Sequence, residues 1–409
     1  MLYILRLAAS NVQLAVVTVF HFLTGNYILR IPDPSLASRT MKTIVILGGS
    51  FAGVSTAHRI LKQAVKIGPV KIILVTPNTH FYWNIAAPRA LVPGQVGDDK
   101  IFRSIAAGFK KYPASQFELI TASAQSLDFE AKKVEISGSA GSKTLDYDYL
   151  ILATGSRTKK DLPLKTLDST DATKDALHDF QAQVKKSKTI VIAGAGATGT
   201  EIAGELGFEY GRQKEIILLA GGPTILETAI PSVSKNAAKL LQDLKVDIKL
   251  QTTVIGAAKT TDGRQEIILS GGDKLITDLY IPTFGVAPNS SYVPGKYLND
   301  NGRVKVDDNL NVKGVQDVWA IGDVSDLEPP QAFLADRQSA HLAKNIILIL
   351  SNKTPLPYKQ GIRGMGVQIG RKAATGHMGN MKLPGFLVNM LRKNLFMDKL
   401  GPTVNGSAF

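Results

Sequence analysis

The chain has 409 residues, of which 44% are hydrophobic and 20% charged, and this composition excludes a disordered or fibrous protein. Its length exceeds what one hydrophobic core usually serves and predicts two or three domains. It contains no cysteine, which excludes disulfides, thiolate metal sites and cysteine nucleophiles. The net charge is +14, but the positive residues are scattered and no basic-aromatic cluster stands out, so we expect no nucleic-acid partner.

The first forty residues differ in character from the rest. Residues 12–29 are mostly apolar and reach the lower length limit for a membrane span, although His21, Gly25 and Asn26 dilute the run. Three interpretations stay open: a signal anchor, a mitochondrial presequence, and an extension upstream of a functional start at Met41. The first two predict a membrane-associated or mitochondrial protein, and the third a cytoplasmic one.

The first glycine-rich turn, GGSFAG, follows an apolar run at 44–47 and opens a helix-like stretch at 54–61. The run is typical of a buried parallel strand. Glycines after it permit a tight turn and close backbone approach to a pyrophosphate, at which the helix points its amide-rich N-terminus. The turn consists of Gly48, Gly49, Ser50, Phe51, Ala52 and Gly53.

A second turn, GAGATG, repeats this arrangement between a strand at 189–193 and a helix at 200–208. Here Gly194, Gly196 and Gly199 complete the pattern GxGxxG. A single match can occur without any ligand. Two correctly framed copies, 146 positions apart (194 minus 48), predict that the chain holds two dinucleotides.

The remaining segments alternate between strand and helix patterns, which predicts an α/β protein. Further strands are expected at 71–75, 117–124, 132–137, 143–149, 215–219, 246–251, 265–270, 278–284 and 318–321, and the segment 148–155 is expected to end a strand in a small-residue turn. Helical patterns occur at 234–244 and 331–350 and within a charged connector at 159–188. The last 50 residues contain a glycine-punctuated β part and an apolar-basic segment at 383–397.

Several separated motifs accompany the two glycine turns. They are FYWNIAAPR at 81–89, LATG at 152–155, FGVAPN at 284–289, Gly322-Asp323, VQIGR at 367–371 and NLF at 394–396. In this order the chain, from Met41 onward, resembles the two-dinucleotide-fold flavoprotein disulfide-reductase superfamily and its thiol-free branch. It is most similar to the ferroptosis suppressor protein group, also called the apoptosis-inducing-factor-like mitochondrion-associated family.

The resemblance implies two Rossmann-like domains and a small C-terminal α+β domain. An FAD domain would comprise residues 41–160 and 285–350, an NAD(P)H domain 161–284, and an acceptor-side or interface domain 351–409. GGSFAG would bind the FAD pyrophosphate and GAGATG would bind NAD(P)H. The other residues implied to contact or enclose the cofactor are Asn84, Arg89, Thr154, Gly155, Gly285, Gly322 and Asp323, whose carboxylate would bind the ribityl chain.

Two residues carry a possible catalytic role by the same resemblance. Glu201 matches a carboxylate that borders the nicotinamide and the flavin, and its alternative role is to stabilise its own helix dipole. Phe396 would lie at the mouth of the flavin and quinone pocket, and its alternative role is in the core. The six histidines form no metal-ligand spacing, so we expect no metal site.

The ribose-binding positions depart from the expected pattern. A Rossmann unit that binds an unphosphorylated ribose usually carries an acid about 20 residues past its glycines. The two strand ends carry Thr76 and Ala220 instead, so Asn78 or the backbone would replace the first acid. At the second site no acid repels a 2′-phosphate and no arginine attracts one, so the sequence leaves the donor as NAD(P)H.

The expected reaction passes a hydride from NAD(P)H to the flavin, whose electrons then reach a quinone-type acceptor or oxygen directly, because the chain has no cysteine pair. A type II NADH dehydrogenase-like enzyme is the second interpretation. Its glutamine-rich quinone segment would fall at 335–340, where only Gln338 is glutamine. A third interpretation is a redox-sensitive, apoptosis-inducing-factor-like binding protein with a structural flavin.

The C-terminal segment is both apolar and basic, which suits docking to an anionic membrane that holds a lipid quinone. Its alternative role is a domain interface or a homodimer interface. The residues concerned are Leu383, Phe386, Leu387, Met390 and Leu391, with Lys382, Arg392, Lys393 and Lys399.

Overall fold

The structure, a computed structural model, describes residues 40–63 and 68–409. The three interpretations of the N-terminal extension concern residues outside this part and stay predictions. Within the described residues, no helix has both the length and the apolar character needed to cross a membrane.

The first half of the fold is built on a parallel sheet in the order β19-β9-β1-β2-β5. Its strands are β1 (Lys42–Leu47), β2 (Val70–Thr76), β5 (Phe117–Thr121), β9 (Tyr149–Leu152) and β19 (Val318–Ala320). Alternate residues of β1 face opposite ways: Ile44 and Ile46 pack in one core, and Val45 and Leu47 in another. A parallel sheet that is covered on both faces needs apolar side chains on both faces, which explains the continuous apolar run at 44–47.

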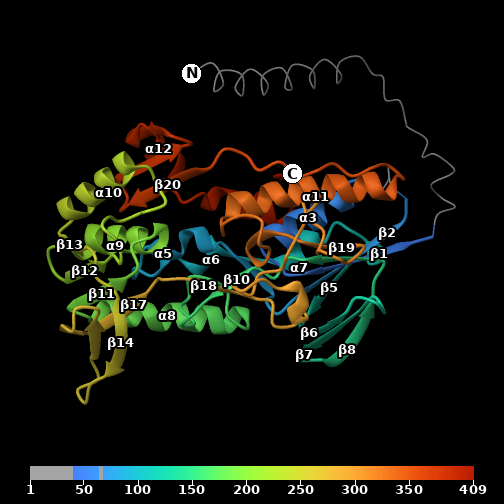
Figure 1. Ribbon diagram of the computed structural model, residues 1–409. Coiled ribbons are helices and arrows are strands. Elements are labelled where there is room, and N and C mark those ends of the chain that lie inside the picture. Colours follow the sequence, from blue (N-terminus) through green and yellow to red (C-terminus); the bar gives the residue numbers. More distant parts are fainter. Residues whose placement is uncertain (1–39, 64–67) are drawn as a thin grey trace. The chain divides into compact units, whose positions relative to one another are not determined.

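Helices cover one face of this sheet and a small antiparallel sheet covers the other (Figure 1). On the helical side, α3 (Phe51–Leu61) lies against α11 (Ala332–Leu350). On the other side lie β6 (Ser123–Asp128), β7 (Lys133–Gly138) and β8 (Gly141–Asp146).

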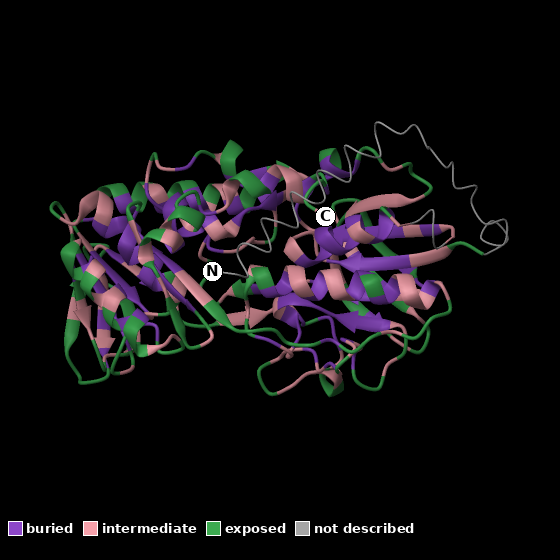
Figure 2. Cartoon of the chain, turned by 90° about the horizontal axis from the view of Figure 1, so that it is seen from above, coloured by how far each residue is buried: buried purple, intermediate pink, exposed green. Residues whose placement is uncertain are grey.

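The second half repeats the design with a parallel sheet in the order β13-β12-β11-β17. Its strands are β11 (Thr189–Ala193), β12 (Glu215–Leu219), β13 (Val246–Lys249) and β17 (Leu279–Pro282). One face packs against α9 (Ala197–Tyr210) and α10 (Pro231–Asp243), and the other against β14 (Val254–Lys259), β15 (Gln265–Leu269) and β16 (Lys274–Thr277). Figure 2 shows the strands at the centre of both halves as buried. The predicted α/β fold is confirmed.

Shorter elements connect the halves and complete the chain. β10 (Ser156–Thr158) pairs with β18 (Val286–Pro288), so the chain leaves and re-enters the first half through two adjacent antiparallel strands. The other elements before residue 300 are β3 (His80–Tyr82), η1 (Asn84–Ala86), α5 (Ala87–Ala90), α6 (Asp98–Ile101), β4 (Phe102–Ser104), α7 (Ile105–Phe109), α8 (Thr170–Lys186) and η2 (Gly295–Tyr297). The predicted domain boundaries stay a prediction.

The C-terminal part forms an antiparallel sheet that packs on α9. It contains β20 (Gly364–Ile369), β21 (Ala373–Met378), β22 (Met381–Leu383), α12 (Gly385–Arg392), η4 (Met397–Lys399) and α13 (Leu400–Val404). The approach is close because Gly204 of α9 has no side chain: a Cβ there would lie 2.9 Å from the backbone nitrogen of Gly370.

Two strand predictions are wrong in detail, and strand β14 is missed. The single strand expected at 117–124 is two strands, β5 and β6, in different sheets, because the amide of Ala122 bonds to Thr76 O at the end of β2. The run at 143–149 likewise divides between β8 and β9. Strand β14 was not predicted, because most of its residues are exposed and lack an apolar alternation.

A buried histidine fixes the C-terminal helix α13 to α3. His58 is fully buried, stacks on Phe109 at 3.9 Å between ring centroids, and donates from Nε2 to the carbonyl of Val404 at 2.8 Å. Burial lowers the pKa of His58 to about 4, so the ring is neutral in the folded protein at pH 7.

This depressed pKa predicts a loss of stability in acid. The unfolded chain takes up the proton near pH 6.5 and the folded chain only near pH 4, so the stabilising contribution is complete above pH 6.5 and disappears as pH falls to 4. The free energy of unfolding of wild type minus that of His58→Gln should fall by about 3 kcal/mol across this window. Denaturant titrations at pH 7, 5.5 and 4 measure it, and a constant difference would contradict the assignment.

Candidate dinucleotide and electron-transfer site

The first glycine turn has the geometry of an anion-binding loop. Gly48 has φ +118°, and a Cβ there would lie 2.2 Å from the carbonyl oxygen of Ala153. A Cβ on Gly53 would lie 1.8 Å from the carbonyl oxygen of Gly48. Ser50, the N-cap of α3, makes no side-chain cap bond, so the first-turn amides of the helix are available to a bound anion.

The second turn has the same form and leaves clear space for a ligand. Gly194 has φ +107°, and a Cβ on Gly199 would lie 1.9 Å from the carbonyl oxygen of Gly194. Gly196 is exposed, and a Cβ there would meet no described atom within 4 Å. No side chain caps α9 at this end. Both loops therefore fit a dinucleotide pyrophosphate at the start of a long helix.

The Gly-Asp pair lies beside the first glycine loop. Gly322 has φ +73°, and a Cβ on it would lie 3.4 Å from the Cβ of Ala52. Asp323, in η3 (Gly322–Val324), accepts from Ser156 Oγ at 2.8 Å and from Lys165 Nζ at 2.7 Å, both at Oδ2. The structure gives Oδ1 no hydrogen bond within its described part. That oxygen is therefore available to a hydroxyl donor such as a ribityl chain.

The two turns at 152–155 and 284–289 contact each other. Thr154 Oγ1 donates to the carbonyl oxygen of Asn289 at 2.6 Å, and Asn289 Nδ2 donates back to Thr154 O at 2.9 Å. Gly155 and Gly285 have φ values of +68° and +73°, which glycine adopts without strain. Gly155 directly precedes β10 and Gly285 directly precedes β18, the two paired crossover strands.

An aromatic cluster follows the first loop. The ring of Phe51 lies 4.9 Å from that of Phe81 and 5.2 Å from that of Trp83, measured between centroids. Asn84 comes next, and its side-chain amide has no hydrogen bond to the described part of the chain. The structure thus brings GGSFAG, the aromatic segment and Gly322-Asp323 together, as the resemblance implies.

Arg89 makes its contacts within the protein. Its Nε donates to Glu205 of α9 at 2.8 Å and its Nη1 to the carbonyl oxygen of Lys393 at 2.7 Å. Trp83 Nε1 donates to the carbonyl oxygen of Leu395 at 2.8 Å. The segment 393–395 is therefore held by side chains of the FYWNIAAPR motif. A role for Arg89 in cofactor binding stays a prediction.

Glu201 lies one turn before Glu205 on α9 and is also buried. Its Oε1 accepts from Arg392 Nη2 at 2.7 Å and from the amide of Gln368 at 3.2 Å. Burial raises the pKa of Glu201, and the Arg392 cation opposes that shift. Arg392 therefore forms an ion pair with Glu201 inside the protein. The prediction that it belongs to the exposed basic residues of the C-terminal segment is wrong.

Phe396 follows the same segment. It has φ +54° and is half-buried, and its ring centre lies 5.6 Å from the guanidinium carbon of Arg392. The structure therefore joins the two predicted catalytic residues through one arginine. Their catalytic roles stay predictions.

The partners Lys165, Glu205 and Arg392 were not assigned to this site from the sequence. Arg392 is 191 positions from Glu201, and Lys165 is 158 positions from Asp323. No short motif contains both members of either pair. The one signal in the sequence is the placement of Glu201 and Glu205 four residues apart among small and apolar residues in the first part of α9.

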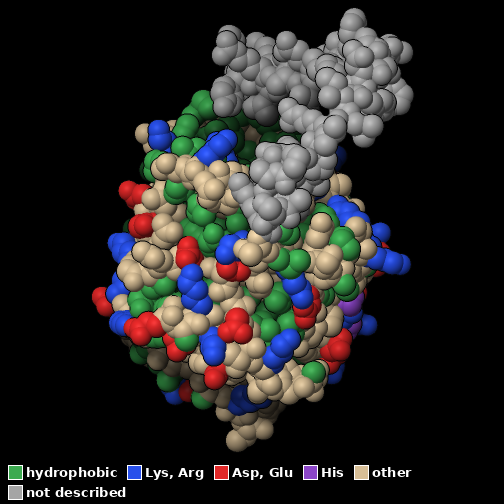
Figure 3. Space-filling model, turned by 90° about the vertical axis from the view of Figure 1, so that its right-hand side faces the viewer, with side chains coloured by type: hydrophobic (Ala, Val, Ile, Leu, Met, Phe, Trp, Pro, Cys, Tyr) green, Lys and Arg blue, Asp and Glu red, His purple; other side chains and the backbone are tan. Residues whose placement is uncertain are grey.

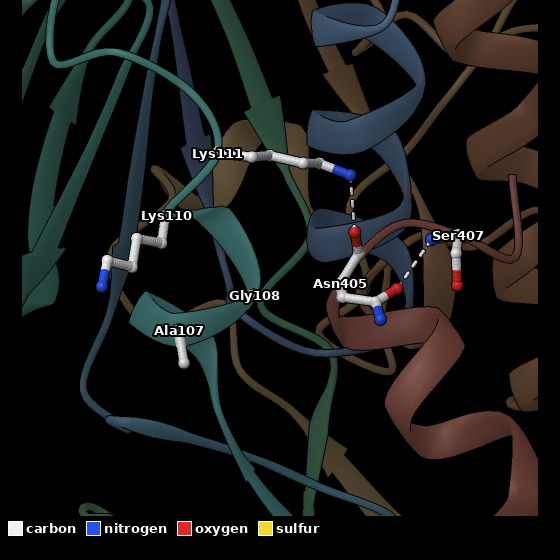
Figure 4. Close-up of a pocket in the computed structure, with 6 residues that line it drawn as sticks. All are labelled: Ala107, Gly108, Lys110, Lys111, Asn405 and Ser407. Atoms are coloured by element: carbon white, nitrogen blue, oxygen red, sulfur yellow. Dashed lines mark hydrogen bonds between the residues drawn. The ribbon is translucent and has the colours of Figure 1, made fainter.

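Other surface features lie outside these contacts. A pocket of about 480 Å³ lies between α7 and the C-terminal residues, where Lys111 donates to the carbonyl oxygen of Asn405 at 2.7 Å. Figure 4 shows the residues that line it. On the face in Figure 3, Lys and Arg side chains are interspersed with Asp and Glu. The positive charge of the chain therefore does not gather on that face.

Comparison with known proteins places the chain in a family. The pyridine nucleotide-disulphide oxidoreductase family matches residues 42–340. The chain belongs to this family. It is 53% identical over 370 residues to oxidoreductase ptaL of Pestalotiopsis fici, covering 90% of this chain and 100% of that protein. It is 27% identical to human ferroptosis suppressor protein 1, covering 89% of this chain and 96% of the relative.

A solved structure has the same fold. NDH2 from Plasmodium falciparum in complex with NADH superposes with a TM-score of 0.73 at 16% identity, covering 89% of this chain and 96% of that one. The predicted fold of two dinucleotide domains and the predicted resemblance are both confirmed.

The buried pair Arg89–Glu205 predicts a large stability effect. The two side chains are 8% and 3% exposed, so Arg89→Met would leave a buried carboxylate without its cation, at a cost of about 3–5 kcal/mol. The double variant Arg89→Met, Glu205→Met should recover much of the loss. Arg371→Met is a matched control, because its partner Glu209 is also on α9 but the pair is 39% and 32% exposed. Equal denaturation midpoints for the Arg89 and Arg371 variants would contradict the prediction.

Proposed function

We propose that this protein is an FAD-dependent NAD(P)H oxidoreductase that reduces a quinone-type acceptor, or oxygen, without a thiol intermediate. The observation that carries the proposal is the pair of uncapped helix N-termini, α3 and α9, each preceded by a loop whose first and last glycine leave no room for a Cβ. Each presents backbone amides and a positive helix end to a pyrophosphate. Family membership supports the same chemistry.

The residues that would hold FAD are those around the first loop. The backbone of 48–53 would bind the pyrophosphate, and Asp323, fixed by Ser156 and Lys165, would accept from the ribityl hydroxyls. Bound FAD would supply the two-electron chemistry, taking a hydride from NAD(P)H and returning electrons to the acceptor. The protein orients the two partners through the glycine loops and the paired turns at Thr154 and Asn289.

Direct transfer to the acceptor follows from composition. A dithiol route requires a cysteine pair, and the chain has no cysteine. Glu201 and Phe396, joined by Arg392, are the residues that we propose on the acceptor side of the site. The raised pKa of Glu201 makes it a candidate for holding a proton beside the acceptor.

The second candidate, a type II NADH dehydrogenase-like enzyme, shares this fold with NDH2. Its diagnostic glutamine would be Gln338, which is 1% exposed. The Oε1 of this residue accepts from the amide of Gly322, and its Nε2 donates to Glu328 at 2.8 Å. Both ends of the side chain are occupied in positioning the Gly-Asp turn. This observation favours the first candidate.

The full chain should purify with a flavin spectrum and oxidise NADH or NADPH with several soluble quinones. Gly196→Val should raise KM for the nucleotide by at least about tenfold without removing FAD, because the new side chain enters the open space at the second loop. Gly295→Val is a matched control, since its Cβ would also meet no described atom within 4 Å. A colourless protein that takes up no FAD would refute the proposal. Retention of FAD with no oxidation of either nucleotide would favour the structural-flavin interpretation.

We further propose that the exposed face of α12 docks on the membrane surface that holds the acceptor. Phe386 is 77% exposed and Met390 57%, and they lie four residues apart, beside Lys382 and Lys393. Membrane docking by an apolar face with flanking lysines would place the acceptor beside the C-terminal segment.

Replacing both apolar residues separates this role from catalysis. Phe386→Ser with Met390→Ser should lower turnover of a long-chain quinone in anionic vesicles by about tenfold, and leave a soluble quinone unaffected. Phe333→Ser, on α11, is the control, since that side chain is 71% exposed. A change from dimer to monomer with unaltered vesicle binding would instead identify a homodimer interface.

A further inference from the structure

The end of β12 lacks the acid expected of a site for unphosphorylated ribose, and the structure brings one there from a later position. Ala220 follows the strand and is 2% exposed. The next residues, Gly221 and Gly222, present only backbone. Glu227 lies against this turn: a Cβ on Gly222 would lie 1.5 Å from its Oε1.

The loop that carries Glu227 is anchored to the second glycine turn. Ile225 and Leu226 are each 1% exposed, and the amide of Leu226 donates to the carbonyl oxygen of Ala195, inside GAGATG, at 2.8 Å. Leu226 has φ +52°, an unusual conformation for a branched side chain, which the buried contacts hold. The carboxylate that follows is therefore held between the glycine turn and the end of β12.

The carboxylate itself has no polar partner in the described part of the chain. Glu227 is exposed, and among the described residues it forms no hydrogen bond or ion pair. No Lys or Arg occurs between positions 220 and 230 to neutralise it or to attract a phosphate. The loop thus presents an acid beside the strand end where a Rossmann unit binds the adenosine ribose.

We propose that Glu227 accepts the ribose hydroxyls of the nicotinamide dinucleotide and makes NADH, rather than NADPH, the donor. The inference rests on the proposed function, since it assumes that the second loop binds the dinucleotide. A carboxylate accepts hydrogen bonds from a 2′- or 3′-hydroxyl, and it repels a 2′-phosphate. In this proposal, an acid seven residues past the usual position (227 minus 220) binds the ribose in place of the missing one.

Binding of nucleotide fragments tests this without any turnover. Isothermal titration of the full, FAD-loaded chain with ADP-ribose and with 2′-phospho-ADP-ribose should show at least about tenfold tighter binding of the first. Glu227→Gln should reduce this preference about tenfold, and the ratio of kcat/KM for NADH over NADPH should fall in parallel. Glu215→Gln is the matched control, because Glu215 is exposed at the opposite end of β12.

A second variant displaces the acid without removing it. Gly222→Ala puts a methyl group where the Glu227 carboxylate lies, so the flexible side chain must move. The preference for ADP-ribose should fall as it does in Glu227→Gln, while the net charge is unchanged.

The outcomes separate the two proposals. Equal binding of the two fragments by wild type, or a preference that Glu227→Gln leaves intact, would overturn the role of Glu227 and leave the oxidoreductase function standing. Failure of wild type to bind either fragment at millimolar concentration would refute the second dinucleotide site and this inference with it.

Discussion

Two buried carboxylates on one helix constrain the whole described structure. Glu201 and Glu205 lie on successive turns of α9, and a buried carboxylate is tolerated only when a cation and hydrogen bonds satisfy it. Arg89 and Arg392 meet this demand from positions 116 and 191 residues away. Arg89 reaches Glu205 only if the FYWNIAAPR segment packs on α9, and Arg392 reaches Glu201 only if the C-terminal helix α12 does. The two ion pairs therefore fix how the three parts of the chain meet.

The same helix begins at the second glycine loop, so the proposed dinucleotide site and the C-terminal part share one rigid element. Its N-terminal end presents free amides near Gly196, and its middle holds Arg89 and Arg392. Close packing of β20 on Gly204 leaves the helix little room to shift. The backbone carbonyls of Lys393 and Leu395 are held in turn by Arg89 and Trp83, which places Phe396 next to these contacts. The contacts that neutralise the buried glutamates of α9 therefore also set the geometry of the proposed acceptor side.

The two halves of the fold solve the same packing problem in the same way. In β1 and in β11, alternate residues face a helical layer and an antiparallel sheet, which is why residues 44–47 and 190–193 are apolar without interruption. Each strand then ends in a glycine turn whose backbone is too crowded for any Cβ at its first and last glycine. The geometry of each glycine loop therefore depends on the fold, because the residues that crowd its first glycine follow the neighbouring parallel strand.

The sequence alone determined the features that depend on neighbouring residues: the apolar strands, the two glycine turns, the long helix at 331–350 and the absence of any thiol. Tertiary structure decided the features that depend on distant residues or on how a loop folds. It split the run at 117–124 between two sheets, paired Asp323 with Lys165, and gave Arg392 to Glu201 instead of to the surface. It also placed the Glu227 carboxylate against Gly222. Spacing along the chain predicted the ribose position at Ala220. Only the folded loop shows which carboxylate lies beside that strand end, because its place depends on the buried anchors at Ile225 and Leu226.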